Sequence, residues 1–112
     1  MSARAETRLW IAQRASAAVL ALCVAVHLAT MIAAARGGLS AADILGRTRG
    51  SFGWAAFYGL FVLAVATHAP IGLRTIAAEW LAWRGRAADA ACAAVGVALL
   101  VLGACAIAAV TR

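Results

Sequence analysis

The sequence predicts an all-α membrane protein with three transmembrane helices. Hydrophobic residues make up 66% of its 112 residues and charged residues only 12%, against about 25% charged in a typical soluble domain. A soluble chain this small could not bury so much apolar surface. Three apolar stretches reach the length of about 20 residues that a helix needs to cross a bilayer. They predict spans at about 10–35, 54–78 and 88–110 within one membrane domain covering 1–112.

Each predicted span is helical because lipid offers the backbone no hydrogen-bond partners. Tryptophans mark the span ends, as in the aromatic belts of membrane proteins, at Trp10, Trp54, Trp80 and Trp83. Between the first two spans, the loop 36–53 contains Ser40 and Asp43 at the spacing of a capping box. We therefore expect a short helix at the membrane surface in this loop.

The arginines predict the orientation of the chain. All ten basic residues are arginine, and the net charge is +6. With the spans running up, down and up, six arginines fall on the side of the N-terminus and four on the other. The positive-inside rule then favours a cytoplasmic N-terminus. Because the arginines flank apolar segments and form no basic stripe, we expect no binding to nucleic acid.

His27 and His68, the only two histidines, both lie inside predicted spans. Ionisable groups at membrane depth are costly and by default indicate a functional site. A neutral imidazole is a strong ligand for iron or other transition metals and a common axial ligand of haem iron, so both histidines are candidate ligands. Counting the helical rise from the span ends puts them about 7 to 10 Å apart in depth. That offset suits two ligand layers, each completed by a histidine from a second chain.

The neighbours of His68 fit this prediction. Gly72 lies one turn along the helix and removes a side chain from the same face, which leaves room for a flat macrocycle. Arg74 lies closer to the predicted cytoplasmic side and suits a haem propionate or another anion. Pro70 frees the carbonyl of Ala66 from its helical hydrogen bond.

Two other interpretations of the histidines stay open at this point. In the first, the protein is a structural anchor without haem, and both histidines only make hydrogen bonds between helices. In the second, the histidines form the proton relay of a small transporter. No span carries an acidic residue at mid-depth, which argues against the transporter.

Three short motifs occur in the order and at the separations of a known family. They are Trp10-x-x-Gln13-Arg14-Ala15-Ser16-Ala17, then His68-Ala69-x-Ile71-Gly72, then Glu79-Trp80. Together they cover nearly the whole chain, which resembles the cytochrome b membrane anchors of succinate dehydrogenase and fumarate reductase. The resemblance implies a multi-pass subunit of the cytoplasmic membrane that holds a flavoprotein and an iron–sulfur subunit. Such an anchor binds haem b and passes electrons to membrane quinone, while the succinate chemistry takes place in another subunit.

The resemblance also implies roles for individual residues. His68 matches the haem ligand of the second helix, and His27 matches the first-helix histidine of members with two haems. The implied quinone site consists of Arg14, Ser16, Glu79 and Trp80. Trp80 departs from the family pattern, because an indole N–H can donate to a quinone carbonyl but cannot relay a proton as a phenol does.

The same resemblance bears on the partner chains. Three alanine-rich helices cannot easily enclose a haem alone, so we expect packing with a second three-helix chain into a haem-binding bundle. That partner is either a paralogous anchor or a second copy of this chain, and the pair holds one or two haems. Anchors of a different flavoprotein dehydrogenase would look the same in sequence, so that alternative also stays open.

Overall fold

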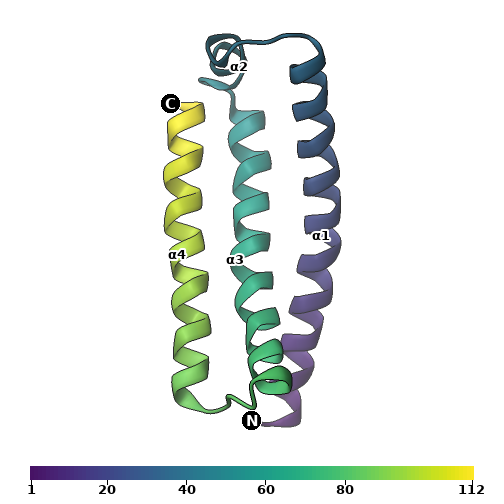
Figure 1. Cartoon of the computed structure of the whole chain (residues 1–112), viewed down its shortest axis with the longest axis vertical. Coiled ribbons are helices and arrows are strands. Elements are labelled where there is room, and N and C mark those ends of the chain that lie inside the picture. Colours follow the sequence, from purple (N-terminus) through teal and green to yellow (C-terminus); the bar gives the residue numbers. More distant parts are fainter.

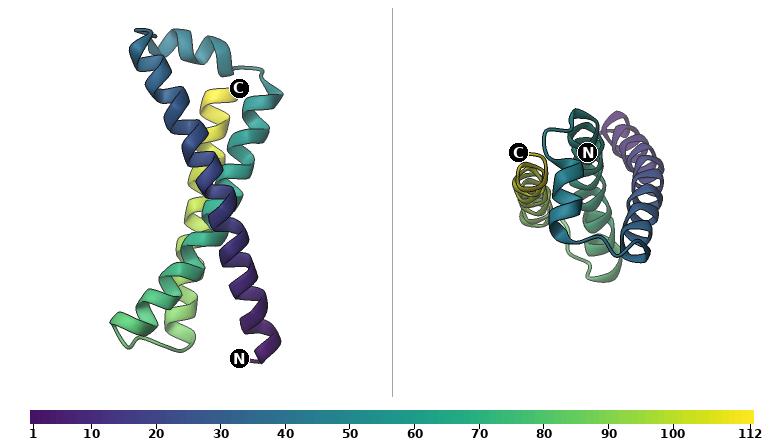
Figure 2. Two further views of the ribbon diagram at one scale, coloured as in Figure 1. Left: turned by 90° about the vertical axis from the view of Figure 1, so that its right-hand side faces the viewer. Right: turned by 90° about the horizontal axis from the view of Figure 1, so that it is seen from above.

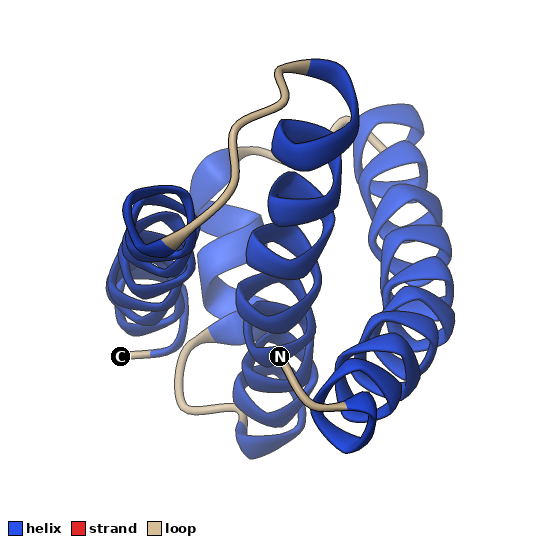
Figure 3. Ribbon diagram, turned by 90° about the horizontal axis from the view of Figure 1, so that it is seen from below, coloured by secondary structure: helices blue, strands red, loops and turns tan.

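The computed structural model describes residues 1–112 as four helices without strands (Figures 1 and 3). The three long helices run up, down and up along a molecule 49 Å in its longest dimension. All three are long and apolar enough to cross a membrane, which confirms the predicted three-span fold. In order, the helices are α1 (Ala3–Arg36), α2 (Ala41–Thr48), α3 (Phe52–Trp80) and α4 (Arg86–Thr111).

Helix α3 lies between α1 and α4 and packs against both (Figure 1). The N-terminus and the loop 81–85 lie at one end of the bundle, which we call the N-terminal end. The C-terminus and α2 lie at the other end, where α2 runs across the tops of the long helices rather than along them (Figure 2).

Helix α1 is longer than the span predicted for it. It begins at Ala3, where the hydroxyl of Ser2 accepts a hydrogen bond from the N–H of Ala5 at 3.3 Å. Hydropathy could not indicate this extension, because the first turns of α1 carry Arg4, Glu6 and Arg8. The Ser2 cap stabilises these first turns, which precede the apolar part of the helix.

The uncharged part of each long helix matches the thickness of a bilayer core. Residues 15–35, 52–73 and 90–111 carry no charge and are each about 21 or 22 residues long, roughly 32 Å at the helical rise. The hydrocarbon core is about 30 Å thick. At the N-terminal end these segments stop at Arg14, Arg74 and Asp89. These three charged residues therefore mark one membrane boundary.

Small residues bring α4 close to α3. A Cβ atom placed on Gly103 would lie 2.5 Å from Cγ1 of Val62, and one on Gly96 would lie 3.0 Å from Cγ of Pro70. The same Gly96 position is 3.2 Å from the carbonyl oxygen of Ala66, the acceptor that Pro70 leaves without its helical donor. Missing side chains on α4 thus set the spacing of the two helices, as in many membrane proteins.

Helix α2 begins at the capping box that the sequence indicates. The N–H of Ser40 donates to Oδ2 of Asp43 at 2.8 Å, and the N–H of Asp43 donates to the hydroxyl of Ser40 at 3.2 Å. At its other end, the hydroxyl of Thr48 donates to the carbonyl of Val110 at 2.6 Å, and the N–H of Gly50 donates to the carbonyl of Thr111 at 2.8 Å. The connection between the first two spans thereby caps the last turn of α4, whose carbonyls have no helical donors.

We expect Gly103→Ala to destabilise the bundle by about 1 to 3 kcal/mol, because the added methyl group overpacks the contact with Val62. Gly59→Ala is the matched control: the space beside Gly59 is open, so alanine there should be neutral or stabilising by up to about 1 kcal/mol. Unfolding of the two variants in detergent measures the difference. Equal stability of the two variants would refute close packing at Gly103.

We also expect the carboxyl group of Asp43 to titrate below its usual pKa of 3.8. The hydrogen bond from the Ser40 hydroxyl lowers this pKa most, followed by the Ser40 backbone N–H and the charge of Arg47. A lowered pKa means that the cap is fully formed above about pH 4 and is lost only as the pH falls through the lower, folded value. NMR titration in micelles measures this pKa. Ser40→Ala should raise it towards 3.8, and an unchanged value would contradict the assigned cause.

Candidate functional site

A cavity lies between α1 and α3 near the N-terminal end. Its volume is about 670 Å³. Residues of both helices line it, so it depends on how α1 packs against α3. Four of the residues predicted from the sequence line it together, namely His68, Gly72 and Arg74 from α3 and Arg14 from α1. The remaining polar lining residues are Glu6, Gln13 and Thr75.

His68 contacts α1 through one ring nitrogen. Its Nδ1 lies 3.3 Å from the hydroxyl oxygen of Ser16, which is 7% exposed. The same hydroxyl donates to the carbonyl of Gln13 at 3.1 Å. The Ser16 oxygen is thus within hydrogen-bond distance of both groups, and the tautomer of His68 decides which partner donates to the other. Nε2 of His68 has no hydrogen-bond partner within the chain.

Gln13 is a site residue that the sequence analysis quoted but gave no role. Its side-chain oxygen Oε1 is buried and has no hydrogen-bond partner. Its Nε2 lies 3.1 Å from the place where a Cβ atom on Gly72 would be. The space that Gly72 opens is thus partly taken by the Gln13 amide. An orphaned acceptor at the wall of a cavity is expected where a ligand supplies the missing donor.

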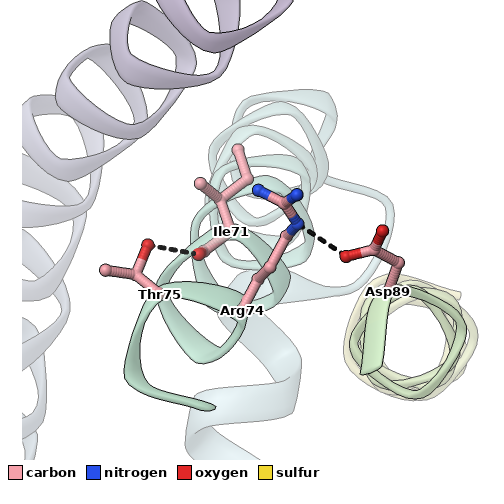
Figure 4. Close-up of polar contacts among 4 residues, drawn as sticks. All are labelled: Ile71, Arg74, Thr75 and Asp89. Carbon is pink, nitrogen blue, oxygen red and sulfur yellow. Dashed lines mark hydrogen bonds and ion pairs between the residues drawn. The ribbon is translucent and has the colours of Figure 1, made fainter. Parts of the chain in front are cut away.

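Arg74 connects α3 to α4 at the membrane boundary. Its Nε donates to Oδ1 of Asp89 at 2.6 Å, while the two terminal nitrogens point away from Asp89 (Figure 4). On the same turn, the hydroxyl of Thr75 donates to the carbonyl of Ile71. The sequence analysis missed Asp89 as a partner, although it is the first charged residue at the start of the third span. The ion pair fixes Arg74 and leaves its terminal N–H groups for an anion.

The four residues expected at a quinone site do not form one cluster in the single chain. Arg14 lines the cavity with His68, and its guanidinium carbon lies 5.3 Å from the ring centre of Trp10. Ser16 is buried against His68 and does not line the cavity. Glu79 lines a second cavity of about 370 Å³ on the far side of Arg74. Trp80 is 81% exposed at the end of α3 and lines neither cavity.

His27 has a partner within the chain that the sequence analysis missed. Its Nδ1 lies 3.2 Å from the hydroxyl of Tyr58, and its ring packs edge-on against Tyr58 and Phe61. Trp54 stacks on Tyr58 at 5.8 Å between ring centres. The signal was present in the sequence: aromatic residues three or four apart on α3 share one face, the face towards α1. A phenol can donate or accept here, so either tautomer of His27 satisfies this contact.

The two histidines lie farther apart in depth than the sequence analysis estimated. His68 is level with Ser16, and His27 is level with Tyr58. Eleven helical residues separate positions 16 and 27, which gives about 16 Å rather than the expected 7 to 10 Å. The estimate was too small because it took Trp10 as the start of the first helix, whereas α1 begins at Ala3. The two histidines therefore lie at different depths, and two ligand layers stay a prediction.

The residues at His68 fit a haem-type ligand. The donor set is an imidazole whose Nε2 is free, beside a buried amide oxygen without a donor and two arginines at the membrane boundary. No three side chains among His, Cys, Asp and Glu gather as a metal site. Axial ligation needs no such cluster, because the macrocycle supplies four of the iron ligands and the protein supplies single side chains.

The comparisons with known proteins identify the family of the chain. A family model described as succinate dehydrogenase/fumarate reductase transmembrane subunit matches residues 1–108. No curated protein and no solved structure matches the chain. The family model covers all three spans and both histidine layers.

The Arg74–Asp89 ion pair should contribute little to stability, despite its short distance. Both side chains are close to half exposed, at 40% and 49%, and exposed pairs contribute about 0.2 to 1 kcal/mol. A double-mutant cycle with Arg74→Ala and Asp89→Ala, measured by unfolding in detergent, should give a coupling energy in that range. A coupling above about 2 kcal/mol would show that lipid removes water from the pair.

Proposed function

We propose that this chain, which belongs to the succinate dehydrogenase/fumarate reductase transmembrane subunit family, is a haem b-binding membrane anchor. It holds a flavoprotein and an iron–sulfur subunit at the cytoplasmic membrane and passes electrons from the iron–sulfur subunit to membrane quinone, or in reverse. The chain itself does not act on succinate or fumarate. The observation that carries this proposal is the free Nε2 of His68, beside a cavity with arginines at its boundary.

The depth of the two histidines supports a second chain as partner. They are about 16 Å apart along the helices, so this chain would supply at most one histidine to each haem. A further ligand would then have to come from another three-helix chain, either a paralogue or a second copy. In a two-fold symmetric dimer, the commonest closed assembly, His68 would pair with His68 and His27 with His27. The anchor pair would then hold two haems.

Residues of this chain would bind and orient each haem. Bound haem b supplies reversible one-electron transfer. The terminal nitrogens of Arg74 would hold a propionate, while Asp89 binds the guanidinium through Nε. Gln13 offers its buried amide oxygen to a donor on the ligand. These contacts orient the group and add the fixed dipoles that tune it.

We place the quinone at the N-terminal end, nearer the boundary than His68. Arg14 lines the cavity there and can donate to a quinone carbonyl. Glu79 lines the neighbouring cavity beside water and can deliver protons for quinol. Trp80, exposed at the end of α3, would close the site together with the iron–sulfur subunit. Ser16 would contact His68 rather than quinone, because its hydroxyl already lies within hydrogen-bond distance of Nδ1 of His68 and the carbonyl of Gln13.

A second candidate function is an anchor without haem. It is favoured by one observation: each histidine has a hydrogen-bond partner on the neighbouring helix of the same chain, Ser16 for His68 and Tyr58 for His27. Such contacts alone stabilise membrane helices by about 0.6 kcal/mol on average. The chain would then attach the peripheral subunits of this or another flavoprotein dehydrogenase.

Reduced-minus-oxidised spectra of the purified membrane complex distinguish these functions. We expect a b-type signal in the wild type that His68→Ala reduces or abolishes. His27→Ala should remove the part of the signal that belongs to the second haem. Tyr58→Phe is the control for His27, because it removes the hydrogen bond but keeps both rings. A wild-type complex without Soret absorbance would overturn haem binding and leave the structural anchor.

A further inference from the structure

We propose that Ser16 is a positioning residue that holds His68 in the tautomer with hydrogen on Nδ1 and presents Nε2 to the cavity. This inference deepens the proposed function, because the presented nitrogen is the one that would bind iron. The tautomer itself is a property of the protein without any cofactor. It can therefore be tested separately from haem binding.

The assignment rests on two distances from one oxygen. The hydroxyl of Ser16 lies 3.1 Å from the carbonyl of Gln13 and 3.3 Å from Nδ1 of His68. In the arrangement that we propose, the single hydroxyl hydrogen points to the nearer carbonyl, and Nδ1 is the donor to the hydroxyl oxygen. A Nδ1 without hydrogen would face a lone pair of the hydroxyl oxygen, and two acceptors do not bind one another. The three atoms form a chain in which His68 donates to Ser16 and Ser16 donates to the α1 backbone.

Ser16 is the protein partner of Nδ1. It is 7% exposed and lies between α1 and α3, and its contact with His68 is part-buried. Removing the hydroxyl would leave the ring N–H without its acceptor on α1, which is unfavourable for a part-buried donor. The ring then relaxes by moving its hydrogen to Nε2 or by rotating. Either change withdraws the lone pair from the cavity.

His27 provides an internal comparison. Its partner is the hydroxyl of Tyr58 at 3.2 Å, and the structure gives that phenol no second hydrogen-bond partner. The phenol hydrogen is thus free to point at Nδ1, which would leave the ring hydrogen of His27 on Nε2. Only His68 has a tautomer that the surrounding protein dictates. The two layers are therefore not equivalent in how they present a nitrogen.

The hydrogen bond also affects the nitrogen that is presented. An imidazole that donates from Nδ1 to a fixed oxygen has a more electron-rich Nε2. A more basic axial ligand favours the ferric over the ferrous state. Ser16 should accordingly hold the midpoint potential of the His68 haem below the value it would have without the hydroxyl.

The first test uses the full chain in detergent micelles, free of haem and labelled with ¹⁵N in histidine. Only two histidines contribute, and His27→Asn assigns their signals. We expect the wild-type spectrum to show Nδ1 of His68 protonated and Nε2 unprotonated. Ser16→Ala should shift most of His68 to the opposite tautomer, while Ser16→Thr, which keeps a hydroxyl at this position, should retain the original one. Ser40→Ala, a matched serine substitution in the cap of α2, should change nothing at His68.

The second test uses the purified complex and does not depend on how the isolated chain folds. In Ser16→Ala the b-type signal of the His68 haem should either be weakened or titrate with a higher midpoint, whereas the wild type, Ser16→Thr and Ser40→Ala should agree with one another. A wild-type His68 with hydrogen on Nε2 would overturn the inference, and so would a Ser16→Ala variant with unchanged tautomer and unchanged midpoint. A complex without any b-type signal would overturn the proposed function. The NMR measurement on the haem-free chain would still determine the tautomer of His68.

Discussion

Polar groups inside the spans have to find partners within the protein, because the surrounding hydrocarbon contains no water to supply them. The backbone meets this constraint by forming helices. Threonines meet it by donating to the carbonyl one turn earlier, as Thr30, Thr67 and Thr111 do. Histidine cannot satisfy itself in this way, so His27 and His68 reach the neighbouring helix. The one buried side-chain nitrogen or oxygen atom without a hydrogen-bond partner is Oε1 of Gln13, a residue of the proposed site.

The same constraint explains why the site lies on one side of α3. Towards α4, glycines bring the backbones into contact, and Gly96 packs against Pro70 and the unpaired carbonyl of Ala66. Towards α1, larger polar residues keep the helices apart and leave the cavity. Pro70 is two residues from His68, so the tight packing on one face fixes where the imidazole stands on the other. The α3–α4 contact therefore helps to position His68, although no residue of α4 lines the cavity.

The sequence predicts most of the fold and only part of the site. Three spans, their order and the capping box of α2 follow from hydropathy and from Ser40 and Asp43, which act locally. The start of α1 does not follow, since its first turns are charged. The partners of the histidines lie 52 and 31 residues away in sequence. Which residues meet across two helices depends on how each helix is rotated about its own axis and on how far one is shifted along the other. Hydropathy gives no information about either quantity.

The connection at the far end of the bundle has a consequence for biogenesis. Thr48 and Gly50 donate to carbonyls of Val110 and Thr111, residues that leave the ribosome long after the first two spans. Until the last turn of α4 is made, the N–H of Gly50 lacks this acceptor, while the Thr48 hydroxyl has only the local carbonyls of Ile44 and Leu45. The loop between the first two spans can therefore bind the third span only after the final residues of α4 have been synthesised.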